Sequence, residues 1–426
     1  MTRIGGGLLV GATALMVVLH GCSSTARSTR AEATASATGV SRPYVVLVSF
    51  DAFRHDYLDK YAPPAFAEIA SRGVRAEALI PAFPSKTFPN HYTLASGLYP
   101  GHHGIVGNVF YDPARGEWYR NNDPKPVGDG TWYSGEPIWA TAQRNGVKSG
   151  VYYWSGSEAA IGGVRPTYWS RFDAKVPNAM RVDSVIGWLR KPPLERPHLV
   201  LLYFSDVDDS THKHGPDAPQ TLQAVASVDR GLRRLLDSLH AMPLGDSTNI
   251  VLVSDHGMTQ VFPQNLVVVG DELARDGVDT VGMRASDNGP TMSIWFDGDS
   301  LRIRAARASF EKGLQHAHAF LRTETPERWH LRDNVRAGDV LIVADAGYFL
   351  QRRASDKPPN PGQHGYDPAL PDMHGIFLAA GPGVRARGVI PAFENVNVYP
   401  FVAALLHLER VPRVDGELGV LRSVLR

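Results

Sequence analysis

Four short, mostly apolar runs stand out along the chain, at residues 44–50, 198–204, 249–255 and 375–381. They are rich in β-branched residues and lack the polar alternation of a half-exposed strand. This pattern is typical of strands that are covered on both faces of a parallel sheet. Amphipathic stretches that suit helices lie between them, for example at 219–242. The alternation predicts an α/β protein with a doubly wound, mostly parallel sheet and helices on both faces.

Two further regions do not follow this alternation. Residues 262–345 are less regular, and we expect them to form an insertion or small cap. The segment 350–373 is rich in proline and is predicted to be a long loop. A loop of that length in a compact domain is usually functional. The length of the folded part suits one large domain with an insertion, or two domains.

The N-terminus has the pattern of a secretory signal. Arg3 precedes the apolar segment 8–19, which is too short to cross a bilayer. The segment ends in Leu-His-Gly-Cys, which resembles a bacterial lipoprotein signal. Residues 1–21 are thus predicted to be cleaved and Cys22 to be lipidated, with an ordinary secreted protein as the alternative. Residues 22–42 are small and polar and suit a flexible tether, so the domain is expected outside the cytoplasm, on the periplasmic face or the cell surface.

Composition limits the classes of partner. Of the 426 residues, 43% are apolar and 20% are charged, and the formal net charge is +1. These values are ordinary for a globular protein, and no basic field for nucleic acid is present. Cys22 is the only cysteine, so no intramolecular disulfide can form. We expect a monomer without specificity for nucleic acids.

Carboxylates and imidazoles lie at the ends of the apolar runs. In open α/β sheets, ligands bind beyond the carboxyl ends of the strands, so these side chains are expected at one edge. Several carboxylates there would raise one another's pKa, and divalent metal ions would remove this repulsion. Aspartate and histidine without cysteine suit zinc. The side chains are Asp51, Asp206, Asp208, Asp209, His212, His214, Asp255, His256 and His374.

Simpler explanations exist for some of these residues taken singly. Asp51 could be a helix N-cap, and the stretch 206–214 could be a solvated polar loop. Adjacent Asp255 and His256 after a buried strand have no packing purpose, and this pair favours a functional role. Asp206 and Asp209 exceed what a metal site needs, and they could orient His212 or be merely exposed.

Thr87 is the hydroxyl best placed for chemistry. Pro89 belongs in the first turn of a helix, so Thr87 is predicted near that helix's N-terminus. Free N–H groups and the helix dipole favour an alkoxide and a phosphate there. No histidine lies at a spacing that suggests a base, and a metal bound through Oγ1 would lower the pKa of the hydroxyl instead. Thr93 and Ser96 lie further along the helix and are expected to be structural.

These motifs resemble the nucleotide pyrophosphatase/phosphodiesterases of the alkaline phosphatase superfamily. The resemblance covers the chain from about residue 44 to its end and implies an alkaline-phosphatase-like fold, with residues 43–426 as the catalytic domain. The matching stretches are SFDAFRHDYL, PSKTFPNHYTLASGLYPGHHGIVGN, DVDDSTHKHGP, SDHGM and GYDPALPDMHGIF.

The resemblance also implies a site with two zinc ions per chain. Thr87 would be the nucleophile, forming a nucleotidyl-threonine that water then cleaves, and Asn108 would donate a hydrogen bond to a phosphoryl oxygen. One zinc ion would be held by Asp208, His212 and His374, and the other by Asp51, Thr87, Asp255 and His256.

The implied substrate is a nucleotide whose base lies between two aromatic rings. Phe88 and Phe172 are the expected pair, with Tyr168 as the competing candidate for the second ring. Stacking tolerates every base, so broad nucleotide specificity would follow. Lys86 is expected to be a surface or substrate-facing cation.

Other activities were weighed against this interpretation. A phosphomonoesterase or phosphonate hydrolase on the same scaffold is the nearest alternative, but no third set of metal ligands and no phosphate-clamping arginine lies beside Thr87. A lipid-directed phosphodiesterase is also open. A sulfatase would need Cys or Ser in a Cys/Ser-x-Pro-x-Arg setting, where this chain has Lys-Thr-Phe-Pro-Asn. A catalytically silent binding lipoprotein would lack a ligand or the nucleophile.

Overall fold

The computed structural model describes residues 42–354 and 357–426. The predicted signal peptide, Cys22 and nearly all of the tether lie outside the described residues. Residues 42–426 form one compact unit.

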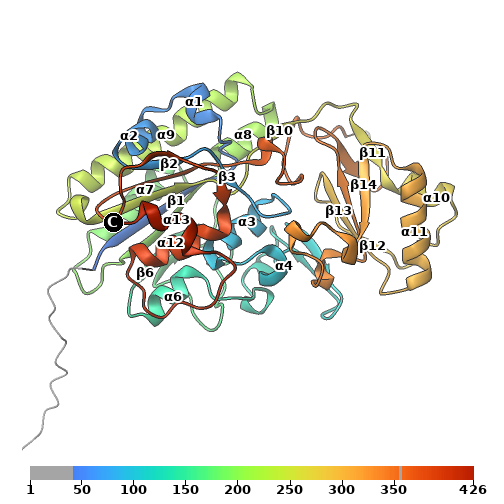
Figure 1. The fold of residues 1–426 in the computed structure, drawn as a ribbon, viewed down its shortest axis with the longest axis horizontal. Coiled ribbons are helices and arrows are strands. Elements are labelled where there is room, and N and C mark those ends of the chain that lie inside the picture. The colour runs from blue at the N-terminus through green and yellow to red at the C-terminus, as the bar shows by residue number, and fades with distance from the viewer. Residues whose placement is uncertain (1–41, 355–356) are drawn as a thin grey trace, which may run out of the picture. The chain divides into compact units, whose positions relative to one another are not determined.

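An eight-stranded sheet forms the centre of this unit, in the order β19-β2-β18-β9-β1-β8-β6-β7 (Figure 1). β1 lies between β9 and β8 and pairs in parallel with both. In this sheet only β18 runs against the other strands. The strands are β1 (Tyr44–Phe50), β2 (Val74–Ala76), β6 (Ser149–Tyr152), β7 (Tyr168–Ser170), β8 (Leu199–Phe204), β9 (Thr248–Val253), β18 (Phe377–Ala380) and β19 (Gly388–Ile390).

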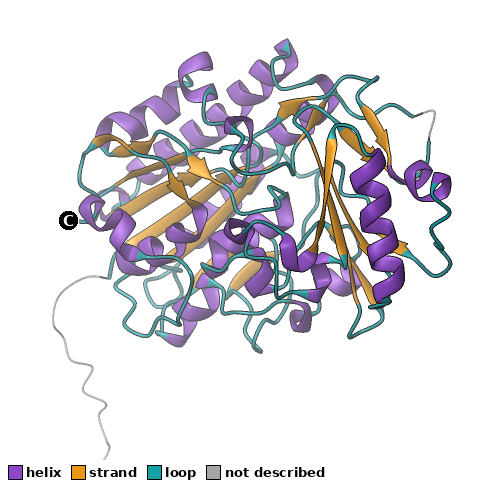
Figure 2. Ribbon diagram, turned by 45° about the vertical axis from the view of Figure 1, so that its right-hand side comes forward, coloured by secondary structure: helices purple, strands orange, loops and turns teal. Residues whose placement is uncertain are grey.

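Helices cover both faces of this sheet, as Figure 2 shows. Successive residues of a strand point to opposite faces. Val45 and Leu47 therefore join the core that contains α3, α6 and α12, whereas Val46 and Val48 join the core that contains α2, α7 and α9. Burial on both faces explains why the strands read as unbroken apolar runs. The predicted α/β fold is confirmed.

The remaining helices and short strands connect these layers. The helices are α1 (Tyr57–Tyr61), α2 (Pro64–Arg72), α3 (Thr87–Ser96), α4 (Pro100–His103), α5 (Pro124–Val127), α6 (Ile138–Arg144), α7 (Asn178–Leu189), α8 (Asp206–His214), α9 (Pro219–His240), α12 (Val398–Leu405) and α13 (Leu418–Leu421). Three two-stranded sheets are formed by β3 (Leu79–Ile80) with β20 (Phe393–Glu394), by β4 (Val109–Asp112) with β5 (Glu117–Arg120), and by β10 (Thr259–Gln260) with β17 (Gly362–Gln363).

Residues 266–351, here called the lobe, have a sheet and a core of their own. Met292, Ile294 and Ile342 of the sheet pack with Phe310 of α11. The predicted insertion at 262–345 is thus more regular than its sequence indicates, because its strands have at most five residues and most of them include polar positions. The lobe contains α10 (Val269–Arg275), α11 (Ser300–Gly313), the pair β11 (Leu266–Val268) and β16 (Phe349–Gln351), and the sheet of β12 (Arg284–Ala285), β13 (Thr291–Trp295), β15 (Val340–Ala344) and β14 (Ala317–Leu321).

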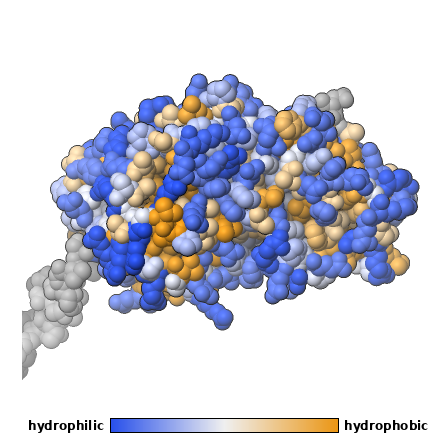
Figure 3. Space-filling view, turned by 45° about the horizontal axis from the view of Figure 1, so that its top comes forward, coloured by the Kyte–Doolittle hydropathy of each residue, from blue (hydrophilic) through white to orange (hydrophobic). Residues whose placement is uncertain are grey.

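No helix of the described part of the chain is both long enough and apolar enough to cross a membrane. In Figure 3, hydrophilic side chains cover most of the visible face, with smaller apolar patches between them.

Candidate active site

Three aspartates meet at one edge of the central sheet. Asp51 directly follows β1, Asp208 lies in the first turn of α8 after β8, and Asp255 follows β9. Because β8, β1 and β9 are parallel neighbours, their carboxyl ends deliver these side chains to the same place. The predicted convergence of Asp51, Asp208 and Asp255 is therefore present in the structure.

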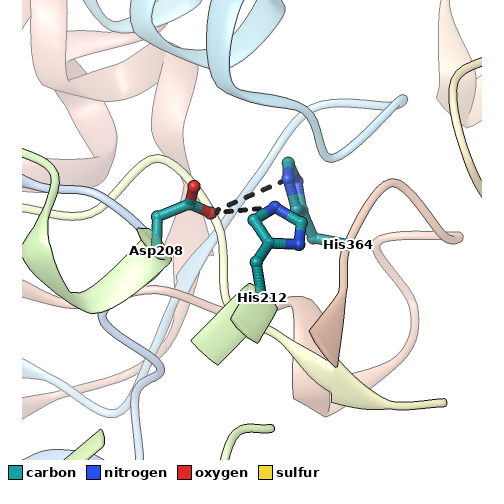
Figure 4. Close-up of side chains that lie close together, drawn as sticks. All are labelled: Asp208, His212 and His364. Carbon is teal, nitrogen blue, oxygen red and sulfur yellow. Dashed lines mark ion pairs between the residues drawn. The ribbon is translucent and has the colours of Figure 1, made fainter. Parts of the chain in front are cut away.

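A first group of possible metal ligands consists of Asp208, His212 and His364 (Figure 4). The ligand atoms of these three side chains all lie within 4.8 Å of one another. Asp208 Oδ1 is 3.4 Å from His212 Nε2 and 3.8 Å from His364 Nε2. Asp208 and His212 are one turn apart on α8, so they share a face of the helix. His364 comes from the loop that follows β17 and is buried.

The structure does not bring His374 into this group. Its ring nitrogen Nε2 lies 2.9 Å from the carbonyl oxygen of Pro368, and its ring contacts that of His55. Among the described residues it belongs to no cluster of candidate ligands. We therefore replace His374 by His364 in the predicted ligand set. Both histidines flank the same proline-rich segment, and the path of a loop cannot be derived from apolar periodicity.

A second group surrounds Thr87. The Nε2 atom of His256 is 3.0 Å from Asp255 Oδ2, 3.4 Å from Asp51 Oδ1 and 3.2 Å from Thr87 Oγ1. Asp51, Asp255 and His256 are almost fully buried. These are the four residues predicted to hold the second metal ion. Asp51 and Asp208 also form a cluster with His256, so the two groups are adjacent.

The histidines of both groups are oriented with Nε2 toward the carboxylates. The Nδ1 atoms of His212, His256 and His364 lie 2.8, 2.9 and 2.9 Å from the carbonyl oxygens of Gly362, Gly257 and Ser85. A carbonyl acceptor fixes the proton on Nδ1 and leaves Nε2 as the metal-binding atom.

The hydrogen bonds of the aspartate oxygens also favour a metal site. In Asp51, Oδ2 accepts a 2.6 Å hydrogen bond from the Tyr203 hydroxyl, and in Asp255, Oδ1 accepts the N–H of Ala52 at 3.2 Å. The other oxygens, Asp51 Oδ1 and Asp255 Oδ2, and also Asp208 Oδ1, are buried without a hydrogen bond from any described residue. Buried oxygens of this kind need a partner, and a cation coordinated by Asp and His fits them.

The pKa shifts of Asp51 and His364 also favour bound metal ions. Burial, and then the charges of Asp255 and Asp208, raise the pKa of Asp51 well above its usual value. Burial lowers the pKa of His364 well below its usual value, assisted by His256 and Lys86. A neutral imidazole is the form that binds metal. Bound cations would let the three aspartates be charged together.

Thr87 begins helix α3, as predicted from Pro89. Its hydroxyl therefore lies where the first-turn N–H groups of the helix are free of intrahelical partners. Asn108 Oδ1 accepts the N–H of Phe88 at 3.0 Å, which fixes the side-chain amide beside this turn. With Oδ1 engaged, the Nδ2 group remains to donate. It makes no hydrogen bond to another described residue, and Asn108 lines the cavity described below.

His91 is a buried neighbour of the site that sequence reasoning missed. One turn after Thr87, its Nε2 is 2.8 Å from Ser49 Oγ, and its Nδ1 is 3.0 Å from the carbonyl oxygen of Thr87 and 3.2 Å from Asp255 Oδ2. Both ring nitrogens are engaged, so His91 supports Asp255 and the start of α3. The i, i+4 spacing from Thr87 was the available signal.

A cavity of about 690 Å³ opens in front of Thr87. This volume suits a small-molecule ligand. Phe88 and Phe172 both line the cavity, and Phe172 is 48% exposed although its ring packs edge-to-face with those of Tyr153 and Tyr203. Sequence reasoning missed further lining residues, which are Trp154, Glu158 and Tyr203.

Tyr168 and Lys86 are not placed as predicted. Tyr168 lies on β7, where its hydroxyl donates to the carbonyl of Glu195 and its ring stacks on Trp188, away from the cavity lining. Lys86 is buried rather than at the surface and is also absent from the lining. Burial lowers the pKa of Lys86 to about 7, although Asp208 opposes this shift.

The extra acids of α8 have separate roles. Asp206 accepts hydrogen bonds from Asn178 and Ser227 at 2.8 and 3.2 Å, which ties α8 to α7 and α9. Asp209 is exposed at the rim of the cavity. Neither residue orients His212, because the carbonyl of Gly362 does so.

Residues 45–367 match the family described as type I phosphodiesterase / nucleotide pyrophosphatase. The chain is 34% identical over 403 residues to an uncharacterized pyrophosphatase/phosphodiesterase of Schizosaccharomyces pombe, covering 91% of this chain and 82% of that protein. It is 35% identical over 373 residues to human ectonucleotide pyrophosphatase/phosphodiesterase family member 5, covering 86% of this chain and 75% of that protein. The chain thus belongs to the type I phosphodiesterase / nucleotide pyrophosphatase family.

Solved structures lead to the same family. Human ectonucleotide pyrophosphatase/phosphodiesterase 5 has a TM-score of 0.84 and 33% identity, with 90% of this chain and 100% of that chain covered. An inactive threonine-to-alanine variant of the murine protein, solved with AMP, also has a TM-score of 0.84, with 32% identity and the same coverage.

Some relatives are considerably longer than this protein. A venom phosphodiesterase of Macrovipera lebetinus is 32% identical over 397 residues, and the match covers 91% of this chain but only 46% of that protein. The predicted class, a hydrolase of phosphodiester or pyrophosphate bonds in an alkaline-phosphatase-like α/β fold, is confirmed at the level of the family.

Separate replacement of His364 and His374 by alanine tests the revised ligand set. His364→Ala removes an Nε2 atom from the first group and is expected to lower metal content and kcat/KM by about 100-fold or more, since even residues that only support metal ligands contribute 10–100-fold. His374→Ala is expected to retain its metal and most of its activity. Atomic spectroscopy and turnover of bis(4-nitrophenyl) phosphate measure both quantities. Loss of metal in His374→Ala with retention in His364→Ala would restore the original assignment.

Proposed function

We propose that this protein is a di-zinc phosphodiesterase that hydrolyses nucleotide pyrophosphate or phosphodiester bonds and releases nucleoside monophosphates. One observation carries the proposal. The Thr87 hydroxyl lies at the N-terminus of α3, 3.2 Å from His256 Nε2, and Thr87 lines the same cavity as Asp208, His212 and His364. A hydroxyl so placed has the surroundings of a nucleophile in phosphoryl transfer.

The reaction would proceed in two displacements at phosphorus. The Thr87 Oγ1–P bond forms as the bond from phosphorus to the leaving oxygen breaks. The oxygen of a water molecule then bonds to phosphorus as the bond to Oγ1 breaks, which releases the nucleoside monophosphate. Asn108 Nδ2 would donate to a phosphoryl oxygen in both steps. Inactivity of the murine threonine-to-alanine variant supports a threonine in this role.

Two zinc ions would supply the charge that this chemistry needs. Asp208, His212 and His364 would hold one ion, and Asp51, Thr87, Asp255 and His256 the other. Bound there, the ions would lower the pKa of the Thr87 hydroxyl and neutralise charge on the phosphoryl oxygens. The unpaired oxygens of the three aspartates and the three oriented histidines support this assignment.

The nucleobase would stack between Phe88 and Phe172 at the mouth of the cavity. Base–aromatic stacking contributes about 1–3 kcal/mol per base and is tolerant of base identity. The AMP bound to murine ectonucleotide pyrophosphatase/phosphodiesterase 5 supports a nucleotide substrate for this chain.

A substrate panel separates this function from its alternatives. We expect ATP and a dinucleotide to be cleaved to nucleoside monophosphate at least tenfold faster, in kcat/KM, than lysophosphatidylcholine or 4-nitrophenyl phosphate. The reason is that only the nucleotides offer both a diester-type phosphorus and a base for the two rings. Release of products is followed by liquid chromatography. A faster reaction with the monoester would favour the phosphomonoesterase, and one with the phospholipid the lipid-directed enzyme.

Removal of the nucleophile tests the covalent mechanism. Thr87→Ala is expected to keep most of its bound zinc, because the other ligands remain, and to lose on the order of 10³-fold or more in kcat. Thr87→Ser retains a hydroxyl and is the matched control, which should keep measurable turnover. Metal content near two ions per chain in the unmodified protein is expected from atomic spectroscopy. Full activity in Thr87→Ala would remove the nucleophile assignment.

We also propose that the enzyme acts outside the cytoplasm and is anchored by a lipid on Cys22. In a bacterial host, the unmodified chain should partition into the detergent phase of Triton X-114, because an acylated cysteine carries long apolar chains. Cys22→Ser is expected to move into the aqueous phase, whereas the neighbouring Ser24→Ala should not. Equal partitioning of all three proteins would exclude the anchor.

A further inference from the structure

One turn of the lobe lies beside segments that carry active-site residues. Residues 286–290 connect β12 and β13, and Asn288 and Gly289 lie at the centre of this connection. The turn is closed by the N–H of Asn288, which donates to the carbonyl of Thr291 at 3.3 Å. We refer to residues 286–290 as the lobe turn.

Asn288 holds the backbone beside Asn108 through both atoms of its amide. Its Oδ1 accepts the N–H of Val109 at 3.0 Å, and its Nδ2 donates to the carbonyl of Val109 at 2.7 Å. Such a paired contact fixes both the position and the rotation of the Val109 backbone. Val109 is the residue next to Asn108, so the same contact fixes the start of the Asn108 side chain.

Gly107, on the other side of Asn108, packs against the same amide. A Cβ atom added to Gly107 would lie 3.2 Å from Asn288 Nδ2. The carbonyl of Asn108 itself accepts the N–H of Asn121 at 2.9 Å. The backbone of residues 107–109 is therefore held from the lobe on one side and from the end of the β4–β5 hairpin on the other.

Gly289 brings the turn close to the two other segments of the site. A Cβ atom on Gly289 would lie 3.1 Å from Gln363 Oε1 and 3.5 Å from Lys86 Nζ. Gln363 precedes His364 and Lys86 precedes Thr87. The φ of Gly289, +74°, also lies in the left-handed region that favours glycine. One turn thus meets the segments that carry Asn108, Thr87 and His364.

We propose that Asn288 is a positioning residue for the phosphoryl-transfer reaction. It sets the location of the Asn108 amide, and through this contact the lobe contributes to stabilising the transition state. Asn288 is not placed to touch the substrate, because its amide is occupied by Val109 and it is absent from the cavity lining. This inference rests on the proposed role of Asn108 as a donor to a phosphoryl oxygen.

A double-mutant cycle tests the proposal with the full chain loaded with zinc and 4-nitrophenyl thymidine 5′-monophosphate as substrate. Asn108→Ala is expected to lower kcat about 10²- to 10³-fold, as for the loss of one donor to a reacting oxygen. Asn288→Ala should lower kcat roughly 10- to 100-fold through misplacement of that donor, with little change in KM. Because both act through the same amide, the double variant should be no slower than Asn108→Ala.

Asn265→Ala is the matched control. This asparagine directly precedes the lobe, and its Nδ2 donates to a backbone carbonyl within the lobe, that of Gly347 at 3.0 Å. It has no contact with the 107–109 segment among the described residues. Its kcat should equal that of the unmodified enzyme, while a small loss of thermal stability is allowed. Equal slowing by Asn265→Ala and Asn288→Ala would overturn the proposal in favour of a general effect of the lobe.

Asn288→Asp carries the test if Asn288→Ala does not fold. It keeps an oxygen for the N–H of Val109 and loses the donor to its carbonyl, so kcat should fall while zinc content is retained. If Asn108→Ala lowers kcat but the losses of kcat in the two single variants multiply in the double variant, the positioning role of Asn288 fails and the proposed function stands. If Asn108→Ala retains full activity, the role of Asn108 fails and the positioning role fails with it.

Discussion

Repulsion among three clustered carboxylates, two of them buried, is the constraint on which this structure depends. Asp51, Asp208 and Asp255 are brought together because β8, β1 and β9 are adjacent and parallel. In Asp51 and Asp208 one oxygen accepts no hydrogen bond from a described residue, whereas Asp255 Oδ2 lies 3.0 Å from His256 Nε2 and 3.2 Å from His91 Nδ1. Burial and the charges of Asp255 and Asp208 raise the pKa of Asp51, whereas the charges of His256 and His91 lower the pKa of Asp255 against the effect of burial. Bound cations would let Asp51 be ionised beside the other two aspartates. The histidines complete the arrangement, since their Nδ1 atoms are fixed by carbonyls and their Nε2 atoms face the same space.

Hydrogen bonds from neighbouring residues hold the candidate ligand side chains in place. Tyr203 and the N–H of Ala52 each occupy one oxygen of an aspartate and thereby direct the other inward. His91 links Ser49 on β1 to the first turn of α3. These contacts come from β8, from α3 and from the turn that directly follows β1, and they give the ligand atoms little freedom to rearrange.

The sequence predicts the centre of this protein well because burial on both faces leaves a strong signal. The apolar run at 44–50 coincides with β1, and the other three runs contain β8, most of β9 and β18. The acidic residues after them are then placed by topology. The strands β2, β7 and β19 have three residues each and carry no such signal. The lobe is not evident as a regular unit because β13 and β14, although five residues long, include polar positions and form no unbroken apolar run.

Loop residues mark the limit of this reasoning. Periodicity places residues at the ends of strands, and His374 was chosen because it precedes an apolar run. His364 lies within the proline-rich segment, whose function could be predicted from its length but whose path could not. Tyr168 was equally plausible by composition, yet its position on β7 turns the ring toward Trp188. Distinguishing such candidates requires the direction of each side chain.

The central place of β1 has a consequence for how the enzyme matures. Its two neighbours are distant in sequence, since Val45 pairs with Leu199 on one side and with Asn249 on the other. Pairings of this kind form slowly, because long loops must close first. A nascent chain that has formed only one of these two strand pairings brings together only part of the ligand set. Metal binding would therefore be coupled to completion of the sheet. Binding of metal ions would then report that the whole centre of the molecule has reached its native register.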